Sequence, residues 1–82
     1  MRKIAILGST GSIGTQALDV IAANPTLFEL FAITGHSNVA LLAEQARRFK
    51  PNMVIVTDDS KYLELKESIS DLDDVKVFAG MQ

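Results

Sequence analysis

The chain has 82 residues, of which 48% are hydrophobic and 22% are charged, and its formal net charge is −2. These values fit one small folded domain or part of a larger one, and they give no basis for nucleic acid as a partner. The lack of cysteine excludes disulfides and cysteine-based metal sites. No apolar run approaches the ~20 residues of a membrane span, and the N-terminus lacks a signal-peptide pattern. We therefore expect a cytoplasmic protein with no membrane partner.

The first half of the chain alternates between strand-like and helix-like patterns. Residues Ile4–Leu7 are continuously apolar, which is typical of a parallel strand covered on both faces. Helical spacing follows over residues 12–23, until Asn24-Pro25 ends the helix. A second apolar run at Leu30–Ile33 predicts the second strand. The predicted inward face of the first helix is Ile13, Ala17, Val20 and Ile21.

The second half repeats this alternation. A loop at Thr34–Ser37 leads to Asn38, a candidate N-cap for a helix that ends at Phe49, before Pro51. A third strand is predicted at Met53–Val56. Asp58 or Asp59 can then cap a third helix. The predicted inward residues of these two helices are Val39, Leu42, Ala43, Ala46 and Phe49, then Tyr62, Leu65 and Ile69.

A fourth strand at Val75–Phe78 alternates in polarity, which places it nearer a sheet edge. The resulting β-α-β-α-β-α-β order predicts an α/β fold with a Rossmann-like, doubly wound parallel sheet, of which this chain supplies only a portion. We expect residues 1–82 to be the N-terminal part of a cofactor-binding domain, with the rest of that domain and a catalytic domain beyond Gln82. The alternative is a self-standing small α/β domain.

A glycine-rich turn, Gly8–Gly14, follows the first strand and opens the first helix. Gly8 allows the tight turn, Gly11 allows the backbone to approach a pyrophosphate, and Gly14 allows the helix to pack closely on the sheet. The helix N-terminus near Ser12 offers N–H groups and a partial positive charge to phosphates. A strand-to-helix turn with no ligand is the alternative, and a Walker A loop is excluded because no Gly-Lys-Ser/Thr ends the turn. Thr10 and Ser12 add hydroxyl donors.

The loop after the second strand indicates which nucleotide is bound. NAD-binding proteins usually place Asp or Glu there, but Thr34–Asn38 contains neither, so that a 2′-phosphate would meet no like charge. The pattern therefore favours NADP over NAD. Arg47 and Arg48 come about two and a half turns later. His36, the only histidine, is open to two interpretations: an exposed loop residue, or a residue near the phosphate.

The acidic residues do not form a catalytic or metal-binding pattern. Asp58-Asp59 is better explained as a helix cap than as a metal pair. Asp19 is expected on the outside of the first helix, and Asp71, Asp73 and Asp74 in a solvated turn. We predict no catalytic residue and no metal ligand within this chain.

The chain resembles the N-terminus of the 1-deoxy-D-xylulose 5-phosphate reductoisomerases. The resemblance covers essentially the whole chain, and its specificity comes from the combination of segments rather than from the glycines alone. The residues that carry it are Ile6–Gly14, Leu18-Asp19-Val20, Asn24-Pro25, Phe28 and Asn38-Val39.

The resemblance implies conversion of a phosphosugar, 1-deoxy-D-xylulose 5-phosphate, to 2-C-methyl-D-erythritol 4-phosphate in non-mevalonate isoprenoid biosynthesis. It implies NADPH, a divalent metal (Mg²⁺, Mn²⁺ or Co²⁺) bound outside this chain, and a homodimer. It also assigns Asn38 to the adenosine end, where Ser37 replaces a lysine of some members and Gly35 lies beside it. The residues matching the pyrophosphate turn are Thr10, Gly11, Ser12 and Ile13, with Gly8 before them.

Two other classes remain open at this point. An extended short-chain reductase or a semialdehyde dehydrogenase uses a similar glycine turn, but would need a downstream Tyr-x-x-x-Lys pair or a nucleophilic cysteine. A non-catalytic nucleotide-binding module of 82 residues is the third possibility.

Overall fold

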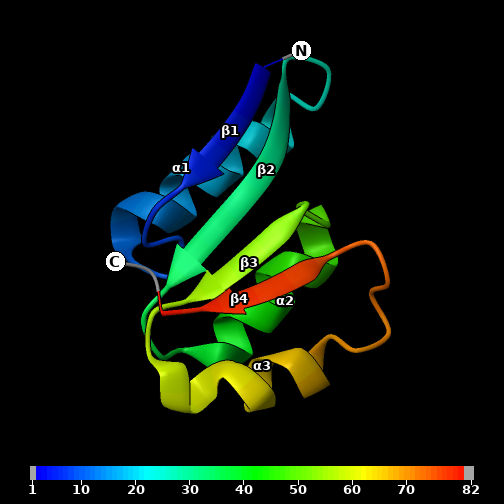
Figure 1. Cartoon of the computed structure of the whole chain (residues 1–82). Coiled ribbons are helices and arrows are strands. Elements are labelled where there is room, and N and C mark those ends of the chain that lie inside the picture. The colour runs from blue at the N-terminus through cyan, green and yellow to red at the C-terminus, as the bar shows by residue number, and fades with distance from the viewer. Residues whose placement is uncertain (1, 81–82) are drawn as a thin grey trace.

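The fold is built on a four-stranded parallel sheet, against which the helices pack (Figure 1). The computed structural model describes residues 2–80, so Met1, Met81 and Gln82 lie outside it. The strands lie in the order β1-β2-β3-β4, and the helices lie on one face of the sheet. The parallel α/β arrangement is confirmed, as is the edge position of β4. The elements are β1 (Arg2–Ile6), α1 (Ser12–Ala23), β2 (Phe28–Gly35), α2 (Val39–Phe49), β3 (Met53–Val56), the 3₁₀ helix η1 (Asp59–Lys61), α3 (Tyr62–Ser68) and β4 (Lys76–Ala79).

The hydrophobic core lies between the sheet and the helices. Ile33 of β2 and Val54 of β3 are register partners, and both are inaccessible to solvent. Leu42 of α2 and Leu65 of α3 are also inaccessible and cover them from the helix side. Burying a side chain of this size contributes about 1.5–3 kcal/mol each, so this layer anchors the carboxyl ends of the strands.

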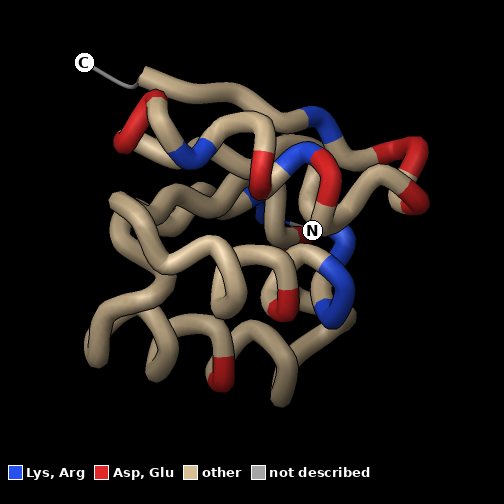
Figure 2. The backbone as a smooth tube through the Cα atoms, turned by 90° about the horizontal axis from the view of Figure 1, so that it is seen from below, with Lys and Arg blue, Asp and Glu red and all other residues tan. Residues whose placement is uncertain are grey.

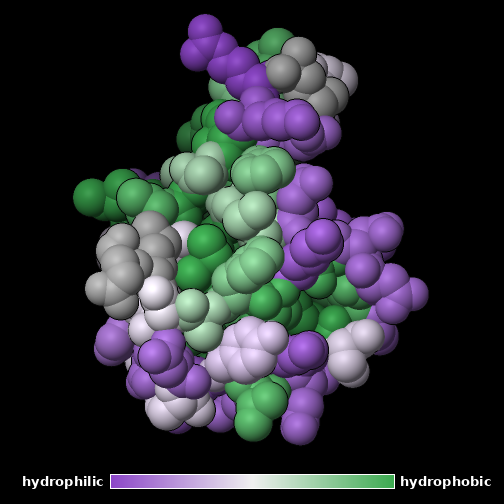
Figure 3. Space-filling view, in the orientation of Figure 1, coloured by the Kyte–Doolittle hydropathy of each residue, from purple (hydrophilic) through white to green (hydrophobic). Residues whose placement is uncertain are grey.

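The other face of the sheet has no helix on it within residues 2–80. Each strand is added on the same side of the previous one, and crossovers of one hand then place their helices on the same face. The expectation that the first strand is covered on both faces is therefore wrong for the described residues, since Lys3 and Ala5 are exposed. In the space-filling view, apolar colour runs across this uncovered face (Figure 3), where Phe78 is 46% exposed.

The inward face of α1 agrees with the predicted one at Ala17 and Ile21 and differs from it at Ile13 and Val20. Leu18 and Ile21 are buried as its apolar contacts, whereas Ile13 is 83% and Val20 is 56% exposed. The physical reason is Gly14, which has no side chain and lies directly against the backbone of Gly8. This close approach makes the 14-18-21 row the contact line and turns the neighbouring apolar row, with Ile13 and Val20, toward solvent.

The predicted cap at Asn38 is confirmed, whereas the cap predicted for the third helix lies on η1, and α3 itself begins after Lys61 with no side-chain cap. Asn38 Oδ1 accepts a hydrogen bond from the Leu41 amide at 3.2 Å at the start of α2. Asp58 Oδ1 accepts from the Ser60 amide at 3.0 Å and caps η1. No helix of residues 2–80 has the length and apolar character needed to cross a membrane.

Charge is distributed unevenly along the chain. No Lys, Arg, Asp or Glu occurs between Lys3 and Asp19, or between Glu29 and Glu44. These two stretches, drawn in tan in Figure 2, include the glycine turn and the loop after β2. The carboxyl ends of β1 and β2 thus receive no formal charge from these two segments, so neither segment opposes the partial positive charge of the helix N-termini.

An ion pair joins the last turn of α2 to the turn after α3. Two guanidinium nitrogens of Arg47 donate to the two carboxylate oxygens of Asp71 at 2.8 Å, and one also donates to the Ser68 carbonyl at 2.6 Å. The hydrogen bonds from Arg47 hold the pKa of Asp71 below its usual value. Folding therefore gains stability from ionised Asp71 above its unfolded pKa of about 3.9, and loses it as the pH falls through the lower, folded pKa.

We expect Asp71→Asn to lower the melting temperature slightly at neutral pH, because both groups are largely solvent-exposed. The difference from the parent should vanish in acid, once the parent carboxylate is protonated in both states. Asp73→Asn is the matched control, since it removes a carboxylate from the same turn and leaves Arg47 paired. Melting curves from neutral to strongly acidic pH test this, and a difference that stays constant in acid contradicts it.

Candidate functional site

The glycine turn and the loop after β2 meet at the carboxyl edge of the sheet. The Ser9 amide donates to the Thr34 carbonyl at 2.7 Å. The Gly8 amide donates to Thr34 Oγ1 at 2.9 Å. Because both bonds join the first βα turn to the end of β2, the two segments predicted to bind one nucleotide are held next to each other. In open α/β sheets this edge is where ligands bind.

Glycine occupies the three positions of the turn for different structural reasons. Gly8 has φ +71°, a conformation that side chains disfavour. A Cβ on Gly14 would lie 2.3 Å from the Gly8 carbonyl oxygen and 2.6 Å from Ser9 Cα. A Cβ on Gly11 would meet nothing closer than the Gly8 carbonyl oxygen at 3.5 Å. The fold therefore requires glycine at positions 8 and 14, while the chain itself leaves room for a side chain at Gly11.

The N-terminus of α1 is left without a side-chain cap. Gly11 is its N-cap residue, and no side chain accepts a hydrogen bond from the first turn. The first turn also contains no acidic residue. Helix geometry leaves the amides of Ser12 and Ile13 without intrahelical acceptors, so they are available to an external anion.

A pocket of about 520 Å³ opens directly at this helix end. It contains the apolar side chains of Leu7 and Ile13 beside backbone amides, with no charged residue among its lining. This arrangement fits a phosphate group, which the amides and helix dipole bind, next to an apolar moiety. The lining residues are Ile6, Leu7, Gly8, Gly11, Ser12, Ile13, Gly14 and Ala17.

The end of β2 and the residues after it supply buried and exposed positions, and the expectation of a loop from Thr34 is wrong for Thr34 and Gly35, which are the last residues of β2. Ser37 and Asn38 are exposed at the start of α2, where a nucleotide can reach them. Gly35 is buried instead, and a Cβ there would lie 3.0 Å from the Leu42 side chain. Its carbonyl accepts from the Thr57 amide at 2.9 Å. The structure thus gives Gly35 a packing role between β2 and α2, and its predicted contact with cofactor stays a prediction.

The structure brings one carboxylate to this loop that its own sequence lacks. The Asp58 amide donates to the His36 carbonyl at 3.0 Å, and His36 Nδ1 lies 2.8 Å from Thr57 Oγ1. Hydrogen bonds from Ser60 hold the pKa of Asp58 low, with a smaller contribution from His36. Asp58 is therefore negative at neutral pH, and a 2′-phosphate at this loop would have a like charge in its neighbourhood after all.

Neither arginine of α2 lies at this loop. Arg47 pairs with Asp71, and Arg48 lies 3.9 Å from Asp19 of α1. Both belong to the last turn of α2. At 1.5 Å per residue they are about 13 Å along the helix axis from its N-terminus, too far to contact a phosphate bound there.

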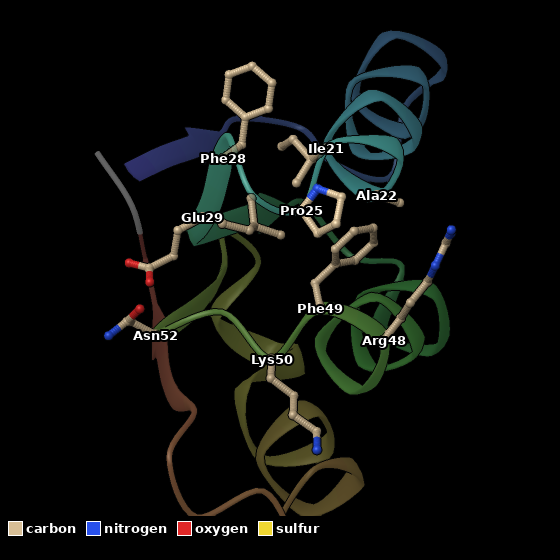
Figure 4. Close-up of a pocket in the computed structure, with 10 residues that line it drawn as sticks. Ile21, Ala22, Pro25, Phe28, Glu29, Arg48, Phe49, Lys50 and Asn52 are labelled. Carbon is tan, nitrogen blue, oxygen red and sulfur yellow. The ribbon is translucent and has the colours of Figure 1, made fainter. Parts of the chain in front are cut away.

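The hollow shown in Figure 4 lies at the opposite end of the sheet. It measures about 530 Å³ and is lined by the C-terminal ends of α1 and α2 and the start of β2. Ile21, Pro25 and Phe49 lie close to one another in it, while the charged ends of Arg48 and Lys50 point away. Helix C-termini present carbonyls and a partial negative charge, so this hollow is unsuited to a phosphate.

Three buried polar residues were not singled out by the sequence pattern. Ser9 is fully buried, and Thr34 and Gln45 are 5% and 6% exposed. Gln45 contacts Ser9 through two hydrogen bonds. The burial of Gln45 could have been predicted from the sequence, because this polar residue lies three positions after Leu42 on the predicted inward face of α2.

The acidic residues of residues 2–80 do not converge. Within that range no three side chains of His, Asp or Glu lie together in a way that could hold a metal ion. Asp58 caps η1, and Asp71 pairs with Arg47. The described residues therefore fit a nucleotide but offer no ligand set for a divalent metal.

Comparison with known proteins agrees with the geometry of the turn. The sequence pattern of the family described as 1-deoxy-D-xylulose 5-phosphate reductoisomerase matches residues 4–82. The enzyme of that name from Phocaeicola vulgatus is 58% identical over 79 residues, which are 96% of this chain and 20% of the relative. This chain thus spans about a fifth of the length of the curated relatives that it matches.

Solved structures agree with the same assignment. The reductoisomerase from Zymomonas mobilis in complex with NADPH superposes with a TM-score of 0.91 at 37% identity, covering 96% of this chain and 21% of the other. A structure of the enzyme with NADPH, fosmidomycin and magnesium has a TM-score of 0.90 at 32% identity, covering 98% and 20%. The chain belongs to the 1-deoxy-D-xylulose 5-phosphate reductoisomerase family.

Proposed function

We propose that the protein carrying this chain converts 1-deoxy-D-xylulose 5-phosphate to 2-C-methyl-D-erythritol 4-phosphate, an NADPH-dependent step of non-mevalonate isoprenoid biosynthesis. The observation that carries the proposal is the uncapped N-terminus of α1 at Gly11, beside a family match over residues 4–82. NADPH supplies the hydride when it is bound. This chain contributes the binding of its pyrophosphate and adenosine parts, and no catalytic group.

The proposed contacts follow the order of the turn. The amides of Ser12 and Ile13 donate to the pyrophosphate, and Gly11 keeps the approach open. Thr10 and Ser12 can add hydroxyl donors. At the adenosine end, Ser37 and Asn38 are the exposed polar residues, and the cap bond to Leu41 orients the Asn38 amide group. Gly35 and Gly8 support these contacts by shaping the two turns.

The rest of the enzyme is proposed to lie outside this chain. We assign residues 1–82 to the N-terminal part of an NADPH-binding Rossmann-like domain, and the metal ligands and substrate contacts to other residues. The length of the relatives supports this assignment, because this chain matches only about a fifth of each of them. A homodimer in the cytoplasm is the proposed working form, with the phosphosugar as the small-molecule partner.

The proposal is tested by following oxidation of NADPH by the intact protein after addition of 1-deoxy-D-xylulose 5-phosphate and Mg²⁺. We expect oxidation that requires the phosphosugar and the metal together. NADPH oxidation with an unphosphorylated or semialdehyde substrate alone, and none with this phosphosugar, would overturn the proposal in favour of another reductase class.

We predict that kcat/KM is about tenfold or more higher with NADPH than with NADH. Residues 34–38, at the end of β2 and the start of α2, have no carboxylate to accept the 2′-hydroxyl of NADH, but their hydroxyl and amide donors can meet a 2′-phosphate. Asp58→Asn should widen the preference, because it removes the like charge near this loop and can retain the cap. Equal kcat/KM values for the two cofactors would refute the prediction.

A further inference from the structure

Gln45 makes two hydrogen bonds to a single residue of the glycine turn. Its side chain reaches from the buried face of α2 to the glycine turn and is 6% exposed. Ser9 Oγ donates to Gln45 Oε1 at 2.6 Å, and Gln45 Nε2 donates to the Ser9 carbonyl at 2.8 Å. Both ends of the amide are therefore used, and both bonds end on Ser9.

These bonds close a network that holds the first residues of the turn. Thr34 accepts from the Ser9 amide at its carbonyl and from the Gly8 amide at its Oγ1. Ser9 Oγ also lies 3.3 Å from the Thr34 carbonyl. Among the described residues, no buried side-chain nitrogen or oxygen lacks a partner. A fully satisfied buried polar network specifies one arrangement, because any other leaves groups unpaired.

The network lies immediately before the residues proposed to bind phosphate. Ser9 is fully buried, whereas Gly11 and Ser12 are exposed. A turn that contains glycine at positions 8 and 11 has wide conformational freedom. The hydrogen bonds of Ser9 with Gln45 and Thr34 restrict that freedom. Phosphate binding by amides depends on their being oriented beforehand.

We propose that Gln45 is a positioning residue for NADPH, which acts through Ser9 to hold the glycine turn in its phosphate-binding shape. The inference rests on the proposed function. Gln45 does not touch the cofactor, and its loss should weaken cofactor binding while leaving the chemistry of the bound complex unchanged.

The decisive variant is Gln45→Met in the intact protein, which keeps the length of the side chain and removes both hydrogen bonds. The Ser9 hydroxyl and carbonyl then lose their buried partner, and the turn gains alternative conformations. We expect the Kd and KM for NADPH to rise about tenfold, with kcat within twofold of the parent. Ser9→Ala, which keeps the carbonyl bond, should raise the same constants about threefold.

Val54→Ala is the matched control. Val54 is inaccessible in the core of β3, and its side chain takes no part in the hydrogen bonds among Ser9, Thr34 and Gln45, so this variant lowers stability by a different route. Its melting temperature should fall while its Kd for NADPH stays within twofold of the parent. The comparison separates a loss of positioning from a general loss of stability.

Fluorescence titration with NADPH, melting curves and steady-state kinetics give the readout. A rise in Kd and KM with unchanged kcat in Gln45→Met or Ser9→Ala, but not in Val54→Ala, supports the inference. If Gln45→Met does not fold, Ser9→Ala decides. Parent-like Kd in the folded variants overturns the inference alone, whereas a parent protein that binds no NADPH overturns the proposed function with it.

Discussion

Replacement of Gly14 by alanine is expected to destabilise the protein more than any other single change in the turn. The new Cβ would lie 2.3 Å from the Gly8 carbonyl oxygen and 2.6 Å from Ser9 Cα. Both atoms belong to the backbone, so no side-chain rotation can relieve the overlap. Overpacking of this kind costs about 1–3 kcal/mol, and we expect a loss of free energy of unfolding of about 3 kcal/mol.

Gly11→Ala is the control for that experiment, because its Cβ would meet only the Gly8 carbonyl oxygen at an ordinary 3.5 Å. The free energy of unfolding should change by less than about 1 kcal/mol. Chemical denaturation of both variants gives the comparison. Equal stability of Gly14→Ala and the parent would show that α1 does not need to approach the Gly8 and Ser9 backbone this closely.

The second large effect is expected on cofactor affinity, from Gly11→Val. A Cβ at Gly11 meets only the Gly8 carbonyl oxygen at 3.5 Å, the residue is exposed, and its φ of −81° and ψ of 173° are an extended conformation that valine adopts readily. The branched side chain would stand where the pyrophosphate is proposed to approach Ser12 and Ile13. Loss of one charge-assisted hydrogen bond, about 1.5–3 kcal/mol, corresponds to a Kd for NADPH that is roughly ten- to a hundredfold higher.

Isothermal calorimetry with NADPH and melting curves on the same samples measure this effect. Gly11→Ala should be intermediate in affinity, since it adds one atom instead of three. A collapse of thermal stability in Gly11→Val with parent-like affinity would mean that glycine at this position serves the fold and not the cofactor.

Much of the fold followed from local patterns in the sequence. The bounds of α1, α2 and β3 agree with those predicted, because proline, glycine and capping residues mark their ends. Asn38 caps α2 as expected, while Asp58 caps the short η1 that precedes α3. β1 and β2 extend further toward their N-termini than their apolar runs, since backbone pairing between Arg2 and Phe28 continues where hydrophobicity does not.

What could not be predicted depends on contacts between distant segments. The rotation of α1 follows from the backbone contact at Gly14, which periodicity alone does not encode. The bonds between Ser9 and Gln45 join residues 36 positions apart. The approach of Asp58 to His36 depends on β2 and β3 being neighbours. The glycine turn could be recognised because its whole signal lies within seven consecutive residues.

The central claim is that the turn of residues 8–14 holds the pyrophosphate of NADPH through the amides at the start of α1. Hydrogen exchange of the intact protein, with and without saturating NADPH, tests it most directly. We predict slower exchange of the amides of Ser12 and Ile13 on NADPH binding, with weaker protection near Asn38. Unchanged exchange at these amides in a protein that demonstrably binds NADPH would contradict the claim.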